Sequence, residues 1–392
     1  MFTWPKHRET WCQSAAYKLF FPPSVGAFRA ARAEYDALNQ IRSDQVSPQD
    51  FVIRGPERKS YMDITLWEWF EQRSSHFRDF RGLAEGAARL PLTTTLVFPT
   101  RNTAGTIGPI LDTVARLNER TGLIEQVVVV DADSADGTAD IARDHGAEVY
   151  SENELLPEYG RAHGKGDAMW RSLSVARGDI VMFADSDSMD FREHFVYGTL
   201  GPLLTDPEVQ FSKAAFRRPF SQDGKSVVDG GGRVTELMAK PLLNFFYPEL
   251  TGFVQPLAGE FAARRELLCS IPFATGYGVE IAMMIDVLNE VGLSAMAQVD
   301  LESRQNRHQP LFELTLMSSA VLRALGRRVH LAGRGAATHD PSEMLALPAR
   351  DIYLHAVGAA EGLRLDEHLV ELLERPPLTH VLSSRQERDT VA

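Results

Sequence analysis

Residues 126–137 read "QVVVVDADSADG", an unbroken run of valines that ends in a cluster of aspartates. β-branched residues without polar alternation are typical of a strand that is buried on both faces, as in a parallel sheet covered by helices. The segment that follows, "TADIARDHG", has the composition of a helix that Gly146 closes. Strand, polar turn and helix in this order predict one repeat of an α/β fold.

The same repeat occurs on both sides of this stretch. The other predicted strands are "TTLVFP" at 94–99, "AEVY" at 147–150 and "DIVMFAD" at 179–185, and the predicted helices span 107–117 and 166–177. Apolar residues recur with helical period in both helical segments. Short apolar strands that alternate with helices predict a doubly wound, mainly parallel sheet of Rossmann-like type, flanked by helices.

Charge, hydropathy and cysteine content exclude several classes of protein. The net charge of −12 argues against a nucleic-acid partner, because clustered Lys and Arg bind phosphate backbones. No apolar run approaches the roughly 18 residues of a membrane span, and the first residues lack the regions of a signal peptide. The two cysteines, Cys12 and Cys269, do not indicate a disulfide framework. We therefore expect a cytoplasmic protein without membrane or nucleic-acid partners.

Polar clusters follow three of the predicted strands, at Pro99–Asn102, Asp131–Ser134 and Asp185–Asp187. Ligands of doubly wound sheets bind at the carboxyl ends of the strands, so we expect the three clusters along one rim. Asp185 and Asp187 offer hard oxygen ligands, which suit Mg²⁺ or Mn²⁺ shared with substrate phosphates. The alternative is that these aspartates only cap or turn the chain.

Lys165 stands between two glycines, in "GKGDAMW" at residues 164–170. The segment is not a P-loop, because Tyr159 occupies the position of its first glycine and Asp167 that of its Ser or Thr. A lysine near a helix start, with glycines on both sides, can still approach a diphosphate closely. A solvated lysine is the alternative interpretation.

A second candidate anion site is "GGGRVTE" at residues 230–236. Consecutive glycines free the backbone to wrap an oxyanion, and Arg233 can recognise phosphate or carboxylate with two parallel hydrogen bonds. Thr235 adds a hydroxyl group. The alternative function of this segment is that of a flexible hinge.

Taken together, these motifs resemble the glucosyl-3-phosphoglycerate synthases and the related actinobacterial mannosyl-3-phosphoglycerate synthases, over roughly Thr94 to Arg328. The segments that carry the resemblance are "VFPTRN", "VVVVDADSADGT", "GKGDAMWRSL", "GDIVMFADSD", "GPLLTDPEVQFSKAAFRRP", "GGGRVTELMAKPLL", "QPLAGEFAARRELL" and "FATGYGVEIAMMID". It implies a retaining GT-A glycosyltransferase that moves glucose or mannose from GDP-mannose, GDP-glucose or UDP-glucose to the 2-hydroxyl of 3-phosphoglycerate. It also implies a role in compatible-solute synthesis, Mg²⁺ or Mn²⁺ as cofactor, and a homodimer.

The resemblance also gives roles to individual residues. The residues expected around the base and ribose are Pro99, Arg101, Asn102, Asp133 and Ser134. Those expected to hold the acceptor phosphate are Gly232, Arg233 and Thr235. Those expected at the nucleotide, sugar and metal are Lys165, Asp185, Asp187, Leu257, Tyr277 and Glu280. Among them Asp187 is the predicted metal ligand, and the predicted catalytic residues are Asp185, Asp187 and Glu280.

Two positions depart from the family pattern. The family has a metal-binding histidine in a segment like "RAHRNRP", whereas residues 303–310 here read "SRQNRHQP". Asn306 aligns with that histidine, and we expect His308 to supply the ligand through a shifted loop, unless the coordination differs. Asp133 stands where relatives often have Gly or Ser.

The chain is predicted to have four parts. They are a mostly helical N-terminal extension at 1–90, a nucleotide-sugar-binding half at 91–190, an acceptor-binding half at 191–330 and a C-terminal tail at 331–392. The tail is predicted to form short helices around Pro341, Pro348, Pro376 and Pro377.

Other functions explain the motifs less well. A sugar-1-phosphate nucleotidyltransferase would have a Gly-rich loop with Arg and Lys directly after the first strand, and "VFPTRNTAG" lacks it. A non-catalytic binding module would lose the aspartate pair or the acceptor arginine. A transferase that acts on another small acceptor, including an inverting one, remains an alternative against which "GGGRVTE" argues.

Overall fold

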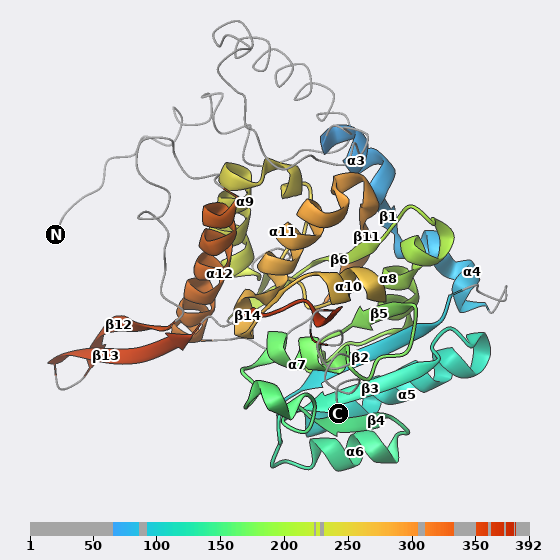
Figure 1. The fold of residues 1–392 in the computed structure, drawn as a ribbon, viewed down its shortest axis with the longest axis horizontal. Coiled ribbons are helices and arrows are strands. Elements are labelled where there is room, and N and C mark those ends of the chain that lie inside the picture. Colours follow the sequence, from blue (N-terminus) through green and yellow to red (C-terminus); the bar gives the residue numbers. More distant parts are fainter. Residues whose placement is uncertain are drawn as a thin grey trace, which may run out of the picture. The chain divides into compact units, whose positions relative to one another are not determined.

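The computed structural model describes residues 66–85, 92–222, 225–227, 231–304, 310–332, 350–359, 362–371, 374–379 and 381. Its main sheet has eight strands in the order β1-β11-β6-β9-β5-β2-β3-β4 (Figure 1). The strands are β1 (Ser74–His76), β2 (Thr94–Thr100), β3 (Gln126–Asp131), β4 (Glu148–Ser151), β5 (Ile180–Phe183), β6 (Phe211–Arg217), β9 (Phe261–Arg264) and β11 (Met296–Ser303). All adjacent strands are parallel except β9, which is antiparallel to both β5 and β6.

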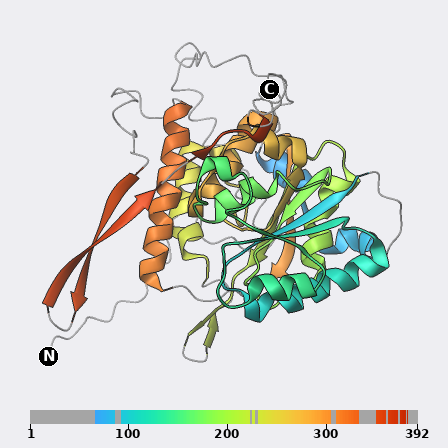
Figure 2. The ribbon, with the colours of Figure 1, turned by 60° about the horizontal axis from the view of Figure 1, so that its bottom comes forward.

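The sheet is buried on both faces, as the valine run predicts. Val128 and Val130 of β3 pack into one hydrophobic core, and Val129 between them packs into the other. The first core includes residues of α7 (Lys165–Ser172) and α11 (Val279–Val291), and the second includes residues of α5 (Ala104–Thr121), α6 (Thr138–Asp144) and α8 (Glu193–Thr205). In Figure 2 the teal helices α5 and α6 lie at the lower right and the orange helix α12 (Leu311–Leu331) lies at the left, with strands of the sheet between them. The predicted doubly wound α/β fold is confirmed.

The N-terminal part is described only from Leu66, and the rest of the predicted extension lies outside the described residues. Helix α3 (Leu66–Arg73) leads directly into β1, which pairs with β11 at the edge of the main sheet. Trp69 of α3 is fully buried, and its Nε1 donates to the carbonyl oxygen of Met296 at 2.7 Å. Part of the extension is therefore built into the core of the sheet.

The described C-terminal residues differ from the predicted helical tail. After α12 the structure has two long antiparallel strands, β12 (Arg350–Ala359) and β13 (Gly362–Glu371), and a two-residue strand, β14 (Glu374–Arg375). The helical prediction rested on proline spacing, but Pro348 and Pro376 stand just outside these strands. Long-range pairing satisfies the backbone groups here, and a local pattern does not reveal it.

Smaller elements complete the description. They are α4 (Arg81–Ala84), β7 (Phe220–Gln222), β8 (Lys225–Val227), a π-helical turn (Thr235–Ala239), α9 (Lys240–Phe246), α10 (Arg265–Ser270), β10 (Phe273–Ala274) and the short 3-10 turns Phe77–Phe80, Pro157–Tyr159, Pro248–Leu250, Gly276–Gly278 and Leu293–Ala295. Among the described helices, none has both the length and the apolar character that crossing a membrane requires.

Candidate active site

A cleft of about 440 Å³ opens at the carboxyl ends of the central strands. Most of the residues predicted from the sequence line it together. These are Pro99, Arg101, Lys165, Asp185, Asp187, Gly232, Arg233, Thr235, Leu257, Tyr277 and Glu280. Residues from distant parts of the sequence therefore meet at one rim, as expected for the carboxyl edge of a doubly wound sheet.

Three predicted nucleotide contacts do not line the cleft: Asn102, Asp133 and Ser134. Ser134 instead joins two strand ends, since its Oγ donates to Asp131 at 2.7 Å and accepts from the amide of Asn102 at 2.8 Å. Asp133 accepts from the Ser151 hydroxyl at 2.7 Å and from the Asn153 side chain at 2.8 Å, and these bonds lower its pKa. All three shape the rim, and their contact with base and ribose stays a prediction.

Asp133 also has an unusual backbone conformation. Its φ of 53° lies in the left-handed region, where glycine is favoured and where Asp and Asn are tolerated better than other residues. The two hydrogen bonds from its neighbours hold the side chain and so help to fix this conformation. The position at which the sequence departs from the family pattern is thus one that a glycine would suit.

Lys165 occupies the centre of the cleft, between two carboxylates. Its Nζ lies 2.5 Å from Oδ1 of Asp185 and 2.9 Å from Oε1 of Glu280. The flanking glycines are needed, because Gly164 has a φ of 77° and a Cβ on Gly166 would overlap with the carbonyl oxygen of Ala274. The helix start therefore packs tightly enough to bring the lysine to the strand end.

The two aspartates of the pair have different surroundings. Burial opposes ionisation of Asp185, but the charges of Lys165 and Arg304 outweigh it and hold the pKa of Asp185 far below its ordinary value. The side chain of Asp187 is 53% exposed, and Arg304 approaches it only to 4.0 Å. Limited hydration, and then the charge of Asp185, raise the pKa of Asp187. Among the described residues, Asp185 is neutralised by Lys165 and Arg304, whereas the one cation beside Asp187 is Arg304 at 4.0 Å.

A divalent metal ion fits this arrangement. Carboxylate oxygens suit Mg²⁺ or Mn²⁺, which take several further ligands from water and substrate phosphates. Asp187 is the described residue that can provide such an oxygen, and no group of three His, Cys, Asp or Glu in the described part could hold a metal without substrate. The other predicted ligand, His308, and its alternative, Asn306, lie outside the described residues.

The "GGGRVTE" segment forms another wall of the cleft. Gly232 has a φ of 71°, and a Cβ on the adjacent Gly231 would overlap with Arg218. These glycines let the backbone turn sharply before the helical residues that begin at Thr235. Arg233 and Thr235 consequently lie at the start of a helical segment, where backbone N–H groups and side chains together favour an anion.

The sequence analysis missed a buried charge cluster beneath the aspartates. Glu260 and Arg304 are each 1% exposed and form an ion pair, and Glu260 also accepts from the backbone amide of Asp185 at 3.3 Å. Arg218 lies half-buried in the cleft wall, with its guanidinium over the ring of Phe216. A charged residue within an apolar segment, Glu260 in "AGEFAA", was the available signal.

Lys213 is a further buried cation that the sequence analysis did not single out. It is 1% exposed, its Nζ donates to the carbonyl oxygen of Ala258 at 2.6 Å, and it lies 5.2 Å from the centre of the Phe261 ring. Burial lowers the pKa of Lys213 to about 8, although the charges of Glu280 and Glu260 oppose the shift. The lysine supports the segment that carries Leu257 and Gly259.

This buried lysine should make stability depend on pH. Because its pKa falls from 10.5 in an unfolded chain to about 8 in the fold, the unfolded state binds more protons between these values. The free energy of unfolding should therefore rise with pH over this window, by about 3 kcal/mol from this group. Lys213→Met should lack this pH-dependent stabilisation. We therefore expect the free energy of unfolding, measured by urea denaturation, to rise more between about pH 7.5 and about pH 10.5 in the wild type than in the variant. A difference that does not vary with pH would contradict the prediction.

Comparison with known proteins adds independent information. The family described as "Glycosyl transferase family 2" matches residues 95–236. The mannosyl-3-phosphoglycerate synthase of Rubrobacter xylanophilus is 57% identical, with a TM-score of 0.73 over 80% of this chain and 99% of that chain. Glucosyl-3-phosphoglycerate synthase of Mycobacterium tuberculosis, solved with Mn²⁺, UDP and phosphoglyceric acid, is 35% identical, with a TM-score of 0.63 over 83% of this chain and 97% of that chain.

One further relative, and a second structure of the Mycobacterium tuberculosis protein, agree with these. Glucosyl-3-phosphoglycerate synthase of Petrotoga mobilis is 41% identical over 263 residues, which are 66% of this chain and 80% of that protein. The Mycobacterium tuberculosis protein has also been solved with Mg²⁺ and UDP, at 36% identity and a TM-score of 0.64 over 79% of this chain and 99% of that chain. Divalent metal and nucleotide thus occur together in structures of this fold.

Proposed function

The chain belongs to the glucosyl- and mannosyl-3-phosphoglycerate synthase family of glycosyltransferases, and we propose that its cleft holds the nucleotide sugar and the acceptor against opposite walls. It is a hexosyltransferase of GT-A type that moves a sugar from a nucleotide sugar to 3-phosphoglycerate. The observation that carries the proposal is the convergence of Lys165, Asp185 and Asp187 on the same cleft as Arg233.

We propose the following roles for the donor side. Asp187 holds the metal ion, which when bound neutralises charge on the leaving nucleoside diphosphate. Lys165 orients Asp185 and contacts the diphosphate, and Asp185 accepts hydrogen bonds from ribose or sugar hydroxyls. Glu280, already paired with Lys165, binds hydroxyls of the sugar rather than attacking its anomeric carbon. Retention then follows from attack on the face that the diphosphate leaves, with a departing phosphate oxygen taking the proton of the acceptor hydroxyl.

The activity is tested with purified protein, Mg²⁺, 3-phosphoglycerate and each of GDP-mannose, GDP-glucose, UDP-glucose and UDP-mannose. We expect a phosphorylated glycoside from at least one donor, with the sugar attached at the 2-hydroxyl. Carbon NMR of the product identifies both the attachment point and the anomeric configuration. Absence of product with every donor, or an inverted anomeric centre, would overturn the proposal.

Arg233 is proposed to bind the acceptor phosphate. Loss of a charged partner for a phosphate costs about 2–3 kcal/mol, so we expect Arg233→Ala to raise the KM for 3-phosphoglycerate by roughly 30- to 150-fold. The KM for the nucleotide sugar should change less than twofold, because Lys165 and Asp187 are untouched. An unchanged acceptor KM in steady-state kinetics would move the acceptor phosphate elsewhere.

Glu152 is proposed to read the base of the donor. It lines the cleft with Pro99 and Arg101, and within the described residues its carboxylate has no hydrogen-bond donor of its own. Burial raises the pKa of Glu152, while the charge of Arg101 opposes this. A carboxylate can accept two hydrogen bonds from the N1 and N2 edge of guanine but only one from uracil.

We therefore propose a guanosine diphosphate sugar as the preferred donor. Glu152→Gln should raise the KM for a GDP-sugar by about tenfold, the loss of one good hydrogen bond to a charged group. The KM for the matching UDP-sugar should stay within twofold. If both donors are affected equally, Glu152 supports the fold of the rim instead of selecting the base.

The oligomeric state is a further proposal. Large apolar side chains are exposed on the π-helical turn with α9 and on α12, namely Leu237, Phe245, Leu311 and Leu331. We propose that a second copy of the chain covers these side chains in a homodimer, because they lie on elements that contact one another and exposed large apolar side chains can mark interaction surfaces. Light scattering of the purified protein would distinguish a dimer from a monomer.

A further inference from the structure

We propose that Glu374 and Arg375, the two residues of β14, are positioning residues that hold opposite walls of the cleft in place. The proposal rests on the donor and acceptor walls proposed above and extends them to a part of the chain outside the family motifs. Neither residue lines the cleft. Their effect on catalysis would pass through the elements that they hold.

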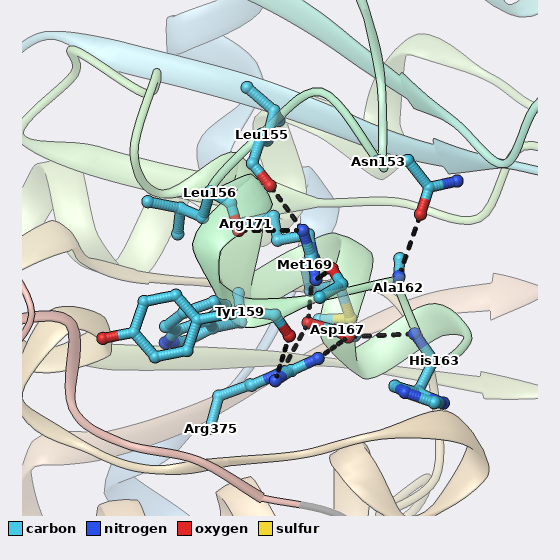
Figure 3. Close-up of polar contacts among 12 residues, drawn as sticks. Asn153, Leu155, Leu156, Tyr159, Ala162, His163, Asp167, Met169, Arg171 and Arg375 are labelled. Atoms are coloured by element: carbon cyan, nitrogen blue, oxygen red, sulfur yellow. Dashed lines mark hydrogen bonds and ion pairs between the residues drawn. The ribbon is translucent and has the colours of Figure 1, made fainter.

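Arg375 binds Asp167, which lies next to the wall of the cleft where we place the nucleotide sugar, here called the donor wall (Figure 3). Its Nε and one terminal nitrogen donate to the two carboxylate oxygens of Asp167 at 3.0 and 2.6 Å, and its other terminal nitrogen donates to the carbonyl oxygen of Tyr159 at 2.9 Å. Asp167 is fully buried, and the two residues lie 208 positions apart in sequence. The paired geometry is one that a guanidinium makes and an ammonium does not.

Asp167 in turn fixes the segment before α7. Its carboxylate accepts from the amide of His163 at 2.9 Å and from Nε of Arg171 at 3.1 Å. Arg171, also fully buried, donates to the carbonyl oxygens of Leu155 at 2.5 Å and Gly160 at 2.6 Å (Figure 3). Residues 153–163 are therefore held in place by the guanidinium groups of Arg171 and Arg375, which both bind the carboxylate of Asp167.

The two ends of this segment lie in the cleft. Glu152 at its start and Gly164 with Lys165 at its end all line the wall where we place the nucleotide sugar. The 3-10 turn at Pro157–Tyr159 and the bond from the Ala162 amide to the Asn153 side chain are local to the segment, and the two guanidinium groups join them to α7 and β14. Fixing its middle through Arg375 consequently sets the distance between the base-reading carboxylate and the diphosphate-binding lysine.

Glu374 binds residues of α12, which forms part of the cleft wall where we place the acceptor. Its carboxylate accepts from Nε of Arg327 at 2.7 Å and pairs with Arg328, and Arg328 also donates to Asp286 of α11 at 2.7 Å. Arg327 and Arg328 belong to α12, which lines the cleft with Leu314, Met317 and Val321. The same helix contacts the π-helical turn that begins at Thr235. Glu374 therefore anchors the wall where we place the acceptor.

The backbone of β14 joins these two anchors. It pairs with β10, with Arg375 opposite Phe273 and Glu374 opposite Ala274. The residues that follow β10 include Gly276 and Tyr277, which line the cleft between the two walls. One short strand thus connects three elements of the site. A substitution at Arg375 should therefore weaken binding of the nucleotide sugar, and a substitution at Glu374 should weaken binding of 3-phosphoglycerate.

The experiment compares Arg375→Lys with Glu374→Gln, which keep side-chain size while removing the paired hydrogen bonds or the charge. We expect Arg375→Lys to raise the KM for the nucleotide sugar by about tenfold, the scale of a small misplacement, and to leave the KM for 3-phosphoglycerate within twofold. Glu374→Gln should raise the KM for 3-phosphoglycerate by about tenfold and leave the KM for the nucleotide sugar within twofold. Arg120→Met is the matched control, because it removes a bidentate pair between Arg120 and Glu193 on the surface. Both KM values should stay unchanged in this variant.

Calorimetry provides a readout that does not depend on turnover. Binding of GDP and UDP should weaken in Arg375→Lys, and binding of 3-phosphoglycerate in Glu374→Gln. Equal losses of kcat with unchanged KM and affinities, or the same KM raised in both variants, would show a purely structural strand and overturn the proposal. If wild-type protein transfers no sugar, the proposed function fails, whereas the affinities still decide the positioning role. If Arg375→Lys does not fold, Arg375→Gln is measured by the same two assays.

Discussion

Asp187→Asn is expected to reduce metal-dependent kcat by a factor of about a thousand or more, because the stabilisation that a bound divalent ion supplies amounts to several kcal/mol. The substitution keeps the size of the side chain and removes the charged oxygen that binds the ion. Asp187 is suited to this role because its side chain is 53% exposed and the guanidinium of Arg304, the nearest in the described part of the chain, is 4.0 Å away. Kinetics over a range of Mg²⁺ and Mn²⁺ concentrations measure the loss.

A binding measurement separates metal loss from misfolding. Titration with Mn²⁺ in the presence of GDP or UDP, followed by electron paramagnetic resonance, should show no tight site in Asp187→Asn. Binding of 3-phosphoglycerate should persist, since Arg233 is unchanged. Asp190→Asn is the matched control three residues away, and it should retain turnover and Mn²⁺ affinity. Retained turnover in Asp187→Asn would make another residue the metal ligand.

How far the sequence predicts this molecule depends on how local each feature is. The valine run at 127–130 and the apolar strand before Asp185 carry their burial in their own composition, so strands, helices and rim were predictable. The ion pair joins Glu260, just before β9, to Arg304, just after β11, and no local pattern identifies the partner of either residue. The pairing of β14 with β10 is equally long-range, which explains why a helical tail was predicted there.

The functional motifs show the same limit at finer scale. Asp133 and Ser134 are predicted nucleoside contacts, and the structure adds that Asp131 and Ser134 use their oxygens to join strand ends, which the motif alone does not indicate. The resemblance already predicts Asp187 as the metal ligand and Asp185 as a contact of the nucleotide sugar. The positions of Lys165 and Arg304 add a physical reason for this assignment, because both cations lie closer to Asp185 than Arg304 lies to Asp187.

The charges of the site explain how an acidic protein binds two anionic substrates. The described carboxylates that line the cleft or lie beneath it are Asp185, Asp187, Glu260, Glu280 and Glu152, and the cations are Lys165, Lys213, Arg218, Arg304, Arg101 and Arg233. Among the described residues the cations therefore slightly outnumber the carboxylates there before any ligand enters, despite a net charge of −12 for the chain. A divalent ion then offsets the diphosphate, and Arg233 meets the acceptor phosphate. Local arrangement, not net charge, determines which anions bind.

Lys165→Met should therefore do more than remove one contact with the donor. It leaves Asp185 and Glu280 without the cation that lies 2.5 and 2.9 Å from them, so two buried carboxylates repel each other and the diphosphate. We expect kcat/KM to fall by a factor of about a thousand, the equivalent of roughly 4 kcal/mol. GDP and UDP binding, measured by calorimetry, should weaken as well.

The packing around Lys165 makes its conservative replacement informative. A Cβ on Gly259 would overlap with both Asp185 and the lysine ammonium, so there is little room for a larger head group. Lys165→Arg should consequently recover only a small part of the activity, although it restores the charge. Lys240→Met, which removes the partly exposed pair with Glu236, is the control and should stay close to wild type. If Lys165→Arg is fully active, charge alone matters at this position, and the close fit of the lysine between two carboxylates has no catalytic role.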